Sequence, residues 1–209
     1  SARWAWRTYG LASFTSYTLS HNLGLALLTG GSARYRIYRA AGLSGGEVGS
    51  VIALASLSFW NGVILLAGLA AMASTQILPF FDWGLSLHWL HLAGLVVLTL
   101  CLIPLLLRHF GLEAVNIGGW RTPLPNLRRS AAMTLIAALD LAAASAALYV
   151  LLPAPDPAAY PAFFLGYALA IIAALISHVP GGLGVFETVV IATVPGDKAQ
   201  LLAALLAYR

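Results

Sequence analysis

Residues 177–184 read Ser-His-Val-Pro-Gly-Gly-Leu-Gly and interrupt an apolar run that extends from Phe163 to Val194. The run is longer than the roughly 20 residues that one membrane-spanning helix needs. Pro180 removes a helical hydrogen bond, and the glycines allow the chain to turn. The sequence therefore predicts two helical pieces joined by a break, a re-entrant element at 163–194.

The composition around this break is that of a membrane protein. Of the 209 residues, 60% are hydrophobic and 9% charged, whereas a soluble domain carries roughly 25% charged residues. We expect a single transmembrane domain over 1–209 with no room for a large soluble catalytic domain. The chain starts at Ser1, shows no signal-peptide pattern and stops inside an apolar run. We therefore expect a segment of a longer protein.

The basic residues predict how this domain sits in the membrane. Apolar runs of spanning length cover about 48–74, 87–107 and 131–152, and a further span starts at 199–209. Lys and Arg fill the loops at 34–39 and 108–129 but are absent from 75–86 and 153–161. The positive-inside rule places the basic loops in the cytoplasm. The net charge of +4 then serves topology and anionic lipid, and we do not expect nucleic-acid binding.

A second broken element is predicted at 9–30. Basic residues flank this run on both sides, and its middle is polar, ending in Ser20-His21-Asn22. A re-entrant pair of half-helices entering from the cytoplasm satisfies both facts, and such a break is tolerated only where it is buried in protein or lines a cavity. By the same charge argument the element at 163–194 enters from outside.

The two breaks resemble each other, because Ser20-His21 followed by Gly24 matches Ser177-His178 followed by Gly181. Repeated broken helices of opposite orientation indicate a transporter site near the bilayer midplane. A chance match in a Gly-, Leu- and Ala-rich sequence is the alternative. The predicted fold is all-α: a polytopic transmembrane bundle with two oppositely oriented re-entrant broken helices, and an inverted repeat as one interpretation.

Two acids are candidates for binding a cationic group. Asp140 lies near the centre of the 131–152 run, where an acid costs roughly 2.5–3.5 kcal/mol. It is expected to face a cavity or, alternatively, to make a structural ion pair or hydrogen bond. Glu187 begins a half-helix. It either complements the helix dipole or binds a cationic headgroup.

Other residues are candidates for binding an anion. Gly181, Gly182 and Gly184 precede the half-helix, whose N-terminus suits a phosphate. Arg34 and Arg36 lie in residues 30–36, predicted as a compact basic turn. They set topology and attract anionic lipid, or they grip a phosphate at the entrance to a path.

The polar residues of the breaks are His21, Asn22, Ser177 and His178. They either bond backbone groups freed by the interruption, or meet a polar headgroup, where a histidine could also shuttle protons. No catalytic constellation, metal site or cofactor motif is visible, and His88 and His91 read as interfacial residues. An intramembrane enzyme therefore ranks last.

Four motifs resemble the membrane domain of the multiple peptide resistance factor (MprF), the bifunctional lysylphosphatidylglycerol synthetase/flippase family. They lie at residues 20–24, 30–36, 57–60 and, most specifically, 177–187. The resemblance implies a multi-pass protein of the bacterial inner membrane. Such a protein moves aminoacylated phosphatidylglycerol, chiefly the lysyl form, from the inner to the outer leaflet and so gives resistance to cationic antimicrobial peptides.

In that family a separate C-terminal synthase domain makes the lipid from aminoacyl-tRNA and phosphatidylglycerol. The resemblance implies such a phosphatidylglycerol lysyltransferase domain as a partner in the full-length chain, and a homodimer is a further expectation. This segment itself is not expected to be an enzyme. Two alternatives remain open: a membrane scaffold that presents phosphatidylglycerol to the synthase, and a transporter of another lipid-linked substrate.

Overall fold

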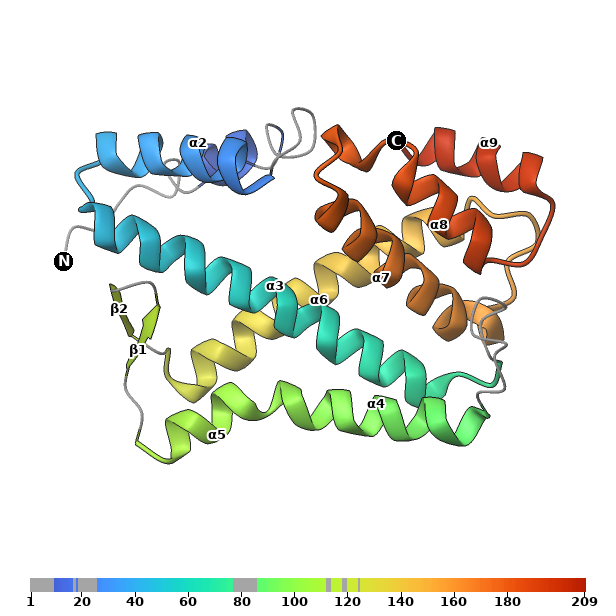
Figure 1. Ribbon diagram of the computed structural model, residues 1–209, viewed down its shortest axis with the longest axis horizontal. Helices are drawn as coiled ribbons and strands as arrows, with labels where there is room; N and C mark the ends of the chain where they lie inside the picture. The colour runs from blue at the N-terminus through green and yellow to red at the C-terminus, as the bar shows by residue number, and fades with distance from the viewer. Residues whose placement is uncertain are drawn as a thin grey trace.

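The computed structural model describes residues 10–16, 18, 26–76, 86–111, 114–117, 120–123 and 125–209, and this part of the chain is predominantly helical (Figure 1). Three stretches are long and apolar enough to cross a membrane. They are α3 (Gly45–Ala73), α6 (Leu127–Tyr149) and residues 157–177, which end in α7 (Tyr160–Ser177). The predicted helical membrane class is therefore confirmed.

Shorter α-helices and two strands surround these stretches. They are α2 (Ala26–Ala40), α4 (Leu87–Cys101), α5 (Ile103–His109), α8 (Val185–Thr193), α9 (Lys198–Tyr208) and the strands β1 (Ala114–Ile117) and β2 (Trp120–Pro123). The strands form a small antiparallel hairpin that pairs Ala114 with Pro123, which the sequence did not predict. The run predicted as one span at 87–107 is divided at Leu102 between α4 and α5. Pro104 has no amide hydrogen for a helical bond, which accounts for the interruption.

Glycines set how closely the long helices approach. A Cβ atom on Gly62 of α3 would lie 2.9 Å from the Cβ of Ala137 on α6. A Cβ on Gly94 of α4 would lie 3.0 Å from the carbonyl oxygen of Gly68 on α3. Small residues allow this contact between helix backbones within a membrane. As a result α3 crosses α6 and lies against α4 (Figure 1).

Two apolar cores form at opposite ends of α3. At its start, Tyr38 of α2 is buried with Val48 and Ala12. Near its end, Ala70 is buried with residues of α6, α7, α8 and α9, including Phe163 and Leu205. The helix α2 and the α7–α8 pair are thus separated along α3 (Figure 1).

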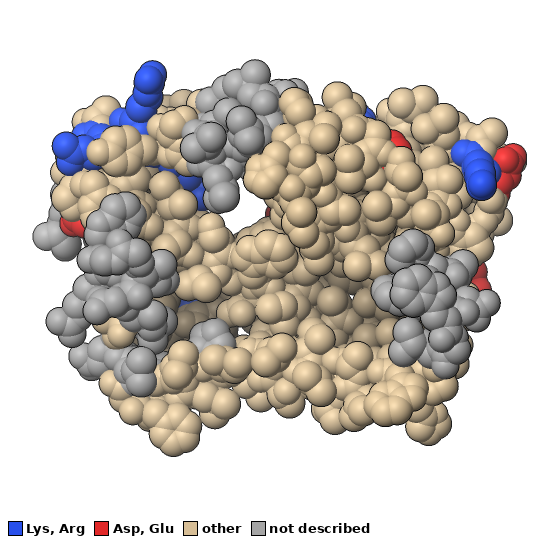
Figure 2. All heavy atoms as spheres, in the orientation of Figure 1, with Lys and Arg blue, Asp and Glu red and all other residues tan. Residues whose placement is uncertain are grey.

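The charged residues are distributed unevenly between these ends. On the face in Figure 2, most Lys and Arg gather at the α2 end, while Asp and Glu stand out at the opposite end. The α2 end is the one that the positive-inside rule places in the cytoplasm. There, Ser44 and Glu47 form a capping box at the start of α3, with the Ser44 amide donating to Glu47 Oε2 at 2.7 Å.

The structure corrects one local prediction. Residues 30–36 do not form a turn, because they lie within α2, which continues to Ala40. A glycine inside a helix costs only about 1 kcal/mol, so Gly30 and Gly31 do not stop it. The first predicted element, 9–30, is therefore followed by ten further helical residues. Its predicted break, including His21 and Asn22, lies outside the described residues.

Candidate functional site

The break after α7 is built from residues with left-handed backbone. His178 follows the helix with φ 55°, and Gly181, Gly182 and Gly184 have φ values of 60°, 63° and 79°. Glycine adopts this conformation without steric cost. The chain can therefore reverse within seven residues and begin α8 at Val185.

The reversed chain packs back against α7. A Cβ on Gly182 would lie 2.6 Å from the Cβ of Ala174. One turn further along α8, the rings of Phe186 and Tyr167 meet edge to face with centroids 5.6 Å apart. The two helices are therefore antiparallel and form a hairpin, α7–α8, with the break at its tip.

A cavity lies at the other end of this hairpin, away from the break. This end cavity has a volume of about 250 Å³ and is lined by Tyr149 of α6, Phe163 of α7 and Thr193 of α8, among others. From Thr193 back to Val185, the nine residues of α8 extend about 13 Å. The start of α8 therefore lies about 13 Å from the end cavity along the helix axis.

Asp140 lies at a similar distance from the end cavity on α6, because it precedes the lining residue Tyr149 by nine residues. Its side chain is exposed, while Ala138, Leu141 and Ser145 form the buried face of α6. It makes no hydrogen bond or ion pair with the part of the chain that the structure describes.

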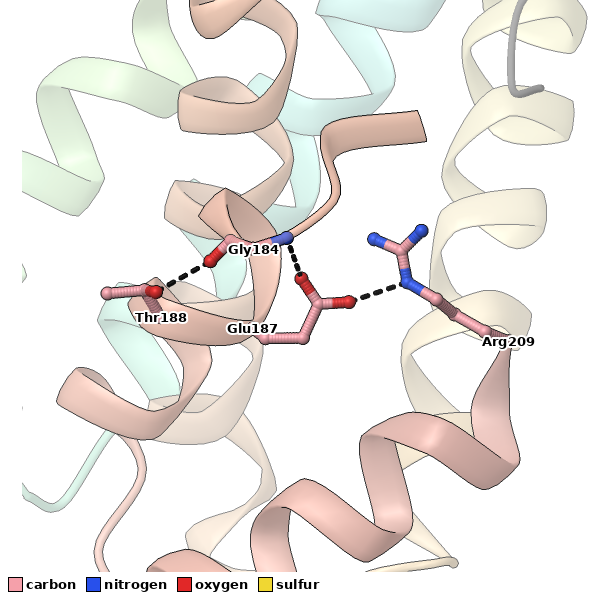
Figure 3. Close-up of polar contacts among 4 residues, drawn as sticks. All are labelled: Gly184, Glu187, Thr188 and Arg209. Atoms are coloured by element: carbon pink, nitrogen blue, oxygen red, sulfur yellow. Dashed lines mark hydrogen bonds and ion pairs between the residues drawn. The ribbon is translucent and has the colours of Figure 1, made fainter. Parts of the chain in front are cut away.

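Glu187 is bonded on both carboxylate oxygens (Figure 3). Its Oε2 accepts the Gly184 amide at 2.8 Å, and its Oε1 lies 2.6 Å from Nε of Arg209. The side chains are only 14% exposed for Glu187 and 30% for Arg209. Thr188 adds a bond from its hydroxyl to the Gly184 carbonyl at 2.6 Å. Glu187 therefore caps α8 and pairs with Arg209, while its binding of a cationic headgroup stays a prediction.

Arg209 was missed by sequence reasoning. It follows α9, and only the reversal between α8 and α9 brings it back to the start of α8 (Figure 1). In the sequence, Arg209 is a single basic residue after an apolar run, and that pattern does not predict which residue it pairs with.

The predicted anion site at the glycines is partly occupied by the protein's own groups. The Gly182 amide donates to the Val179 carbonyl at 2.8 Å, and the Gly184 amide donates to Glu187. An anion at the start of α8 would therefore compete with the Glu187 carboxylate. The nearest positive charge for it in the described chain is Arg209, paired to that carboxylate.

Ser177 and His178 bond to backbone in this structure. The Ser177 hydroxyl donates to the Ala174 carbonyl at 2.9 Å and accepts the Val179 amide at 3.3 Å. The His178 ring nitrogen Nδ1 lies 2.6 Å from the Ile176 carbonyl oxygen. Both side chains therefore serve the backbone freed by the break, while remaining exposed.

Arg34 and Arg36 lie far from the α7–α8 hairpin. Arg34 is half-buried and Arg36 exposed on α2. Between them, Tyr35 lies beside Gly45 at the very start of α3, with its hydroxyl 3.7 Å from an added Cβ. The hairpin packs at the other end of α3. The structure thus joins Glu187 to Arg209, but it does not bring Arg34 and Arg36 to them.

These features define a helical membrane protein with a broken helix whose tip carries a charged pair. No family model matches the chain. Its relatives include the "Uncharacterized protein slr0712" of Synechocystis sp. (strain ATCC 27184 / PCC 6803 / Kazusa), 41% identical over 200 residues that cover 94% of this chain and 61% of the relative. They also include the "Inner membrane protein YbhN" of Escherichia coli (strain K12), 33% identical over 205 residues that cover 95% of this chain and 63% of the relative.

The chain spans less than two thirds of the length of either relative. The inner-membrane relative and the three apolar helices together support a membrane location. The resemblance to the multiple peptide resistance factor family stays a prediction.

Proposed function

We propose that this chain is part of a lipid transporter of the bacterial inner membrane that moves aminoacylated phosphatidylglycerol, chiefly the lysyl form, from the inner to the outer leaflet. The observation that supports it most is the Glu187–Arg209 pair at the tip of the α7–α8 hairpin. Ionisable residues at membrane depth are expensive and generally mark a substrate path. A helix break at that depth is tolerated where it lines a cavity.

The charges of the pair complement those of the proposed substrate. A lysyl headgroup carries ammonium groups beside a phosphate. Its ammonium can take the place of Arg209 on the Glu187 carboxylate, while its phosphate takes the place of Glu187 on the guanidinium. The carboxylate, the guanidinium, the phosphate and one ammonium all stay paired during such an exchange, which avoids the cost of leaving an ion of the pair without a partner.

Other residues extend this path toward the two leaflets. Asp140 offers a second carboxylate at a similar distance from the end cavity, free of partners within the described chain and suited to a second amine. Arg34 and Arg36 lie at the end assigned to the cytoplasm, where they attract the phosphate of an inner-leaflet lipid.

The test uses the full-length protein in cells that make lysylphosphatidylglycerol, with an amine-reactive reagent that reads the outer leaflet alone. Glu187→Gln keeps an acceptor for the Gly184 amide but removes the charge that pairs with Arg209. We expect the outer fraction of lysyl-lipid to fall at equal expression and equal total lipid. Asp197→Asn, a change at the N-cap of α9, is the control and should leave that fraction unchanged.

The same assay distinguishes lipid transport from the alternative of a membrane scaffold. If the chain only presents phosphatidylglycerol to a synthase, Glu187→Gln lowers total lysyl-lipid and leaves its distribution between leaflets as in the wild type. That result would replace transport by presentation.

A further inference from the structure

The end cavity holds a set of groups that the proposed path does not use. It lies where the end of α3, the loop after α6 and the loop after α8 meet, and its volume is about 250 Å³. That is room for about eight water molecules, enough for a headgroup amine but not for a whole phospholipid. Its described lining is largely apolar and contains one charged residue, Asp156, and one side-chain amide, Gln76.

Asp156 is held at the cavity by its own loop. Its Oδ1 accepts the Ala158 amide at 3.0 Å, and its backbone carbonyl accepts the Tyr149 hydroxyl. Its other carboxylate oxygen has no partner in the described chain. No Lys or Arg is among the described lining residues, and no described residue forms an ion pair with the exposed Asp156 carboxylate.

Aromatic rings form the wall beside this carboxylate. Tyr149 and Phe163 both line the cavity, with ring centroids 4.7 Å apart and planes inclined at 48°. The Tyr149 ring is fixed further by an edge-to-face contact with Tyr160 at 5.2 Å. Rings held in place next to a single carboxylate suit an organic cation, which gains from the ring faces and from the charge together.

We propose that the end cavity binds an organic ammonium group, with Asp156 supplying the charge and Tyr149, backed by the buried Phe163 ring, the aromatic surface. A metal cation fits poorly, because one carboxylate and rings offer too few oxygen ligands. With a lipid as the source, the inference rests on the proposed function and assigns the place where the headgroup amine is held at the outer end. A soluble amine offers the same chemistry.

The experiment measures equilibrium binding without transport. The full-length protein in nanodiscs of phosphatidylglycerol alone is titrated with choline, and with its uncharged carbon analogue 3,3-dimethylbutanol, by ligand-observed NMR. A second arm incorporates lysylphosphatidylglycerol and measures its retention by native mass spectrometry. We expect choline to bind and the uncharged analogue to bind more weakly.

Asp156→Asn is the main variant and Asp197→Asn its matched control. Both acids cap a helical turn through Oδ1, at 3.0 Å from Ala158 and Ala199 respectively, and asparagine caps equally well. We expect Asp156→Asn to raise the choline Kd about three- to fivefold, as for an exposed charge pair, with Asp197→Asn unchanged. Equal affinities in the two variants would overturn the proposal.

Tyr149 gives a second test that does not depend on charge. Tyr149→Phe keeps the ring, whereas Tyr149→Leu removes it. We expect the leucine variant to weaken choline binding by about two- to fivefold. The phenylalanine variant keeps the ring but loses the hydroxyl bond to the Asp156 carbonyl, and it should weaken binding less. If both variants bind choline like the wild type, the aromatic part of the site is refuted.

The two arms separate the sources and the two proposals. If Asp156→Asn lowers the retention of lysyl-lipid, the ligand is the lipid headgroup. If Asp156→Asn weakens choline binding but leaves lipid retention unchanged, the ligand is a soluble amine. Asp156-sensitive binding in a protein that moves no lipid would remove the transport proposal and leave the cavity assigned. Lipid transport by a protein whose choline binding does not change with Asp156→Asn would remove the cavity proposal and leave the transport proposal standing.

Discussion

Glu187 and Arg209 join the first turn of α8 to the end of α9 through an Oε1–Nε contact of 2.6 Å. The same carboxylate accepts the Gly184 amide at the tip of the break. One side chain therefore fixes the break, the half-helix and the following helix relative to one another. Any ligand that draws Glu187 away from Arg209 would loosen all three.

Two substitutions at Glu187 separate its cap from its ion pair. Glu187→Gln retains an acceptor for the Gly184 amide, as capping boxes do with either residue, whereas Glu187→Ala loses both interactions. We expect the free energy of unfolding to fall by about 1 kcal/mol for glutamine and about 2 kcal/mol for alanine. Detergent-titrated unfolding followed by circular dichroism measures both, and equal losses would show that the cap contributes nothing.

Gly182 is predicted to be intolerant of a side chain for two separate reasons. Its φ is 63°, and an added Cβ would lie 2.6 Å from the Cβ of Ala174. At Gly184, with φ 79°, nothing lies within 4 Å. Gly184→Ala should therefore show backbone strain alone, about 1–2 kcal/mol, and Gly182→Ala a further 1–3 kcal/mol from overpacking.

The double variant Gly182→Ala with Ala174→Gly tests that division. Removing the Ala174 methyl relieves the contact but not the backbone strain, and a glycine inside α7 adds a cost of about 0.5–1 kcal/mol. The double variant should therefore be less stable than Gly184→Ala by about that amount. A double variant no more stable than Gly182→Ala alone would count against the packing of the break on α7.

The α3–α6 crossing gives a third prediction. Gly62→Ala places a Cβ 2.9 Å from that of Ala137 and should lower stability by about 1–3 kcal/mol. Gly31→Ala is the control, because a Cβ there meets nothing within 4 Å and Gly31 lies inside α2. Alanine should stabilise that helix by about 0.5–1 kcal/mol. A destabilising Gly31→Ala would contradict a helical α2.

How much the sequence could predict depended on how local the cause was. Composition predicted the membrane class, because too few charged residues are present to cover a soluble surface. Pro180 with its glycines predicted the break, because these residues change the backbone at their own positions. The continuation of α2 through Gly30 and Gly31 was missed, since a small propensity penalty was taken for a stop.

Contacts between distant segments were beyond the sequence. Arg209 meets Glu187 only through the reversal between α8 and α9, and no periodicity encodes that distance. The end cavity has the same origin, because Gln76, Tyr149 and Thr193 come from three separate elements. For Asp140, by contrast, the sequence alone supplied the argument, namely the cost of an acid near the centre of an apolar run. Its role in binding a substrate stays a prediction.

Asp140→Asn should separate a transport role from a structural one. The side chain is exposed on a candidate span and has no partner in the described chain. Its charge therefore lowers the stability of the folded protein in the membrane. Neutralising it is expected to leave stability unchanged or raise it by up to about 2 kcal/mol. The outer fraction of lysyl-lipid should nevertheless fall at equal expression, because the second amine of the headgroup loses its carboxylate. Detergent unfolding and the leaflet-resolved amine assay measure the two effects on the same variant. A loss of stability would reveal a structural partner for Asp140, and an unchanged outer fraction would remove Asp140 from the path.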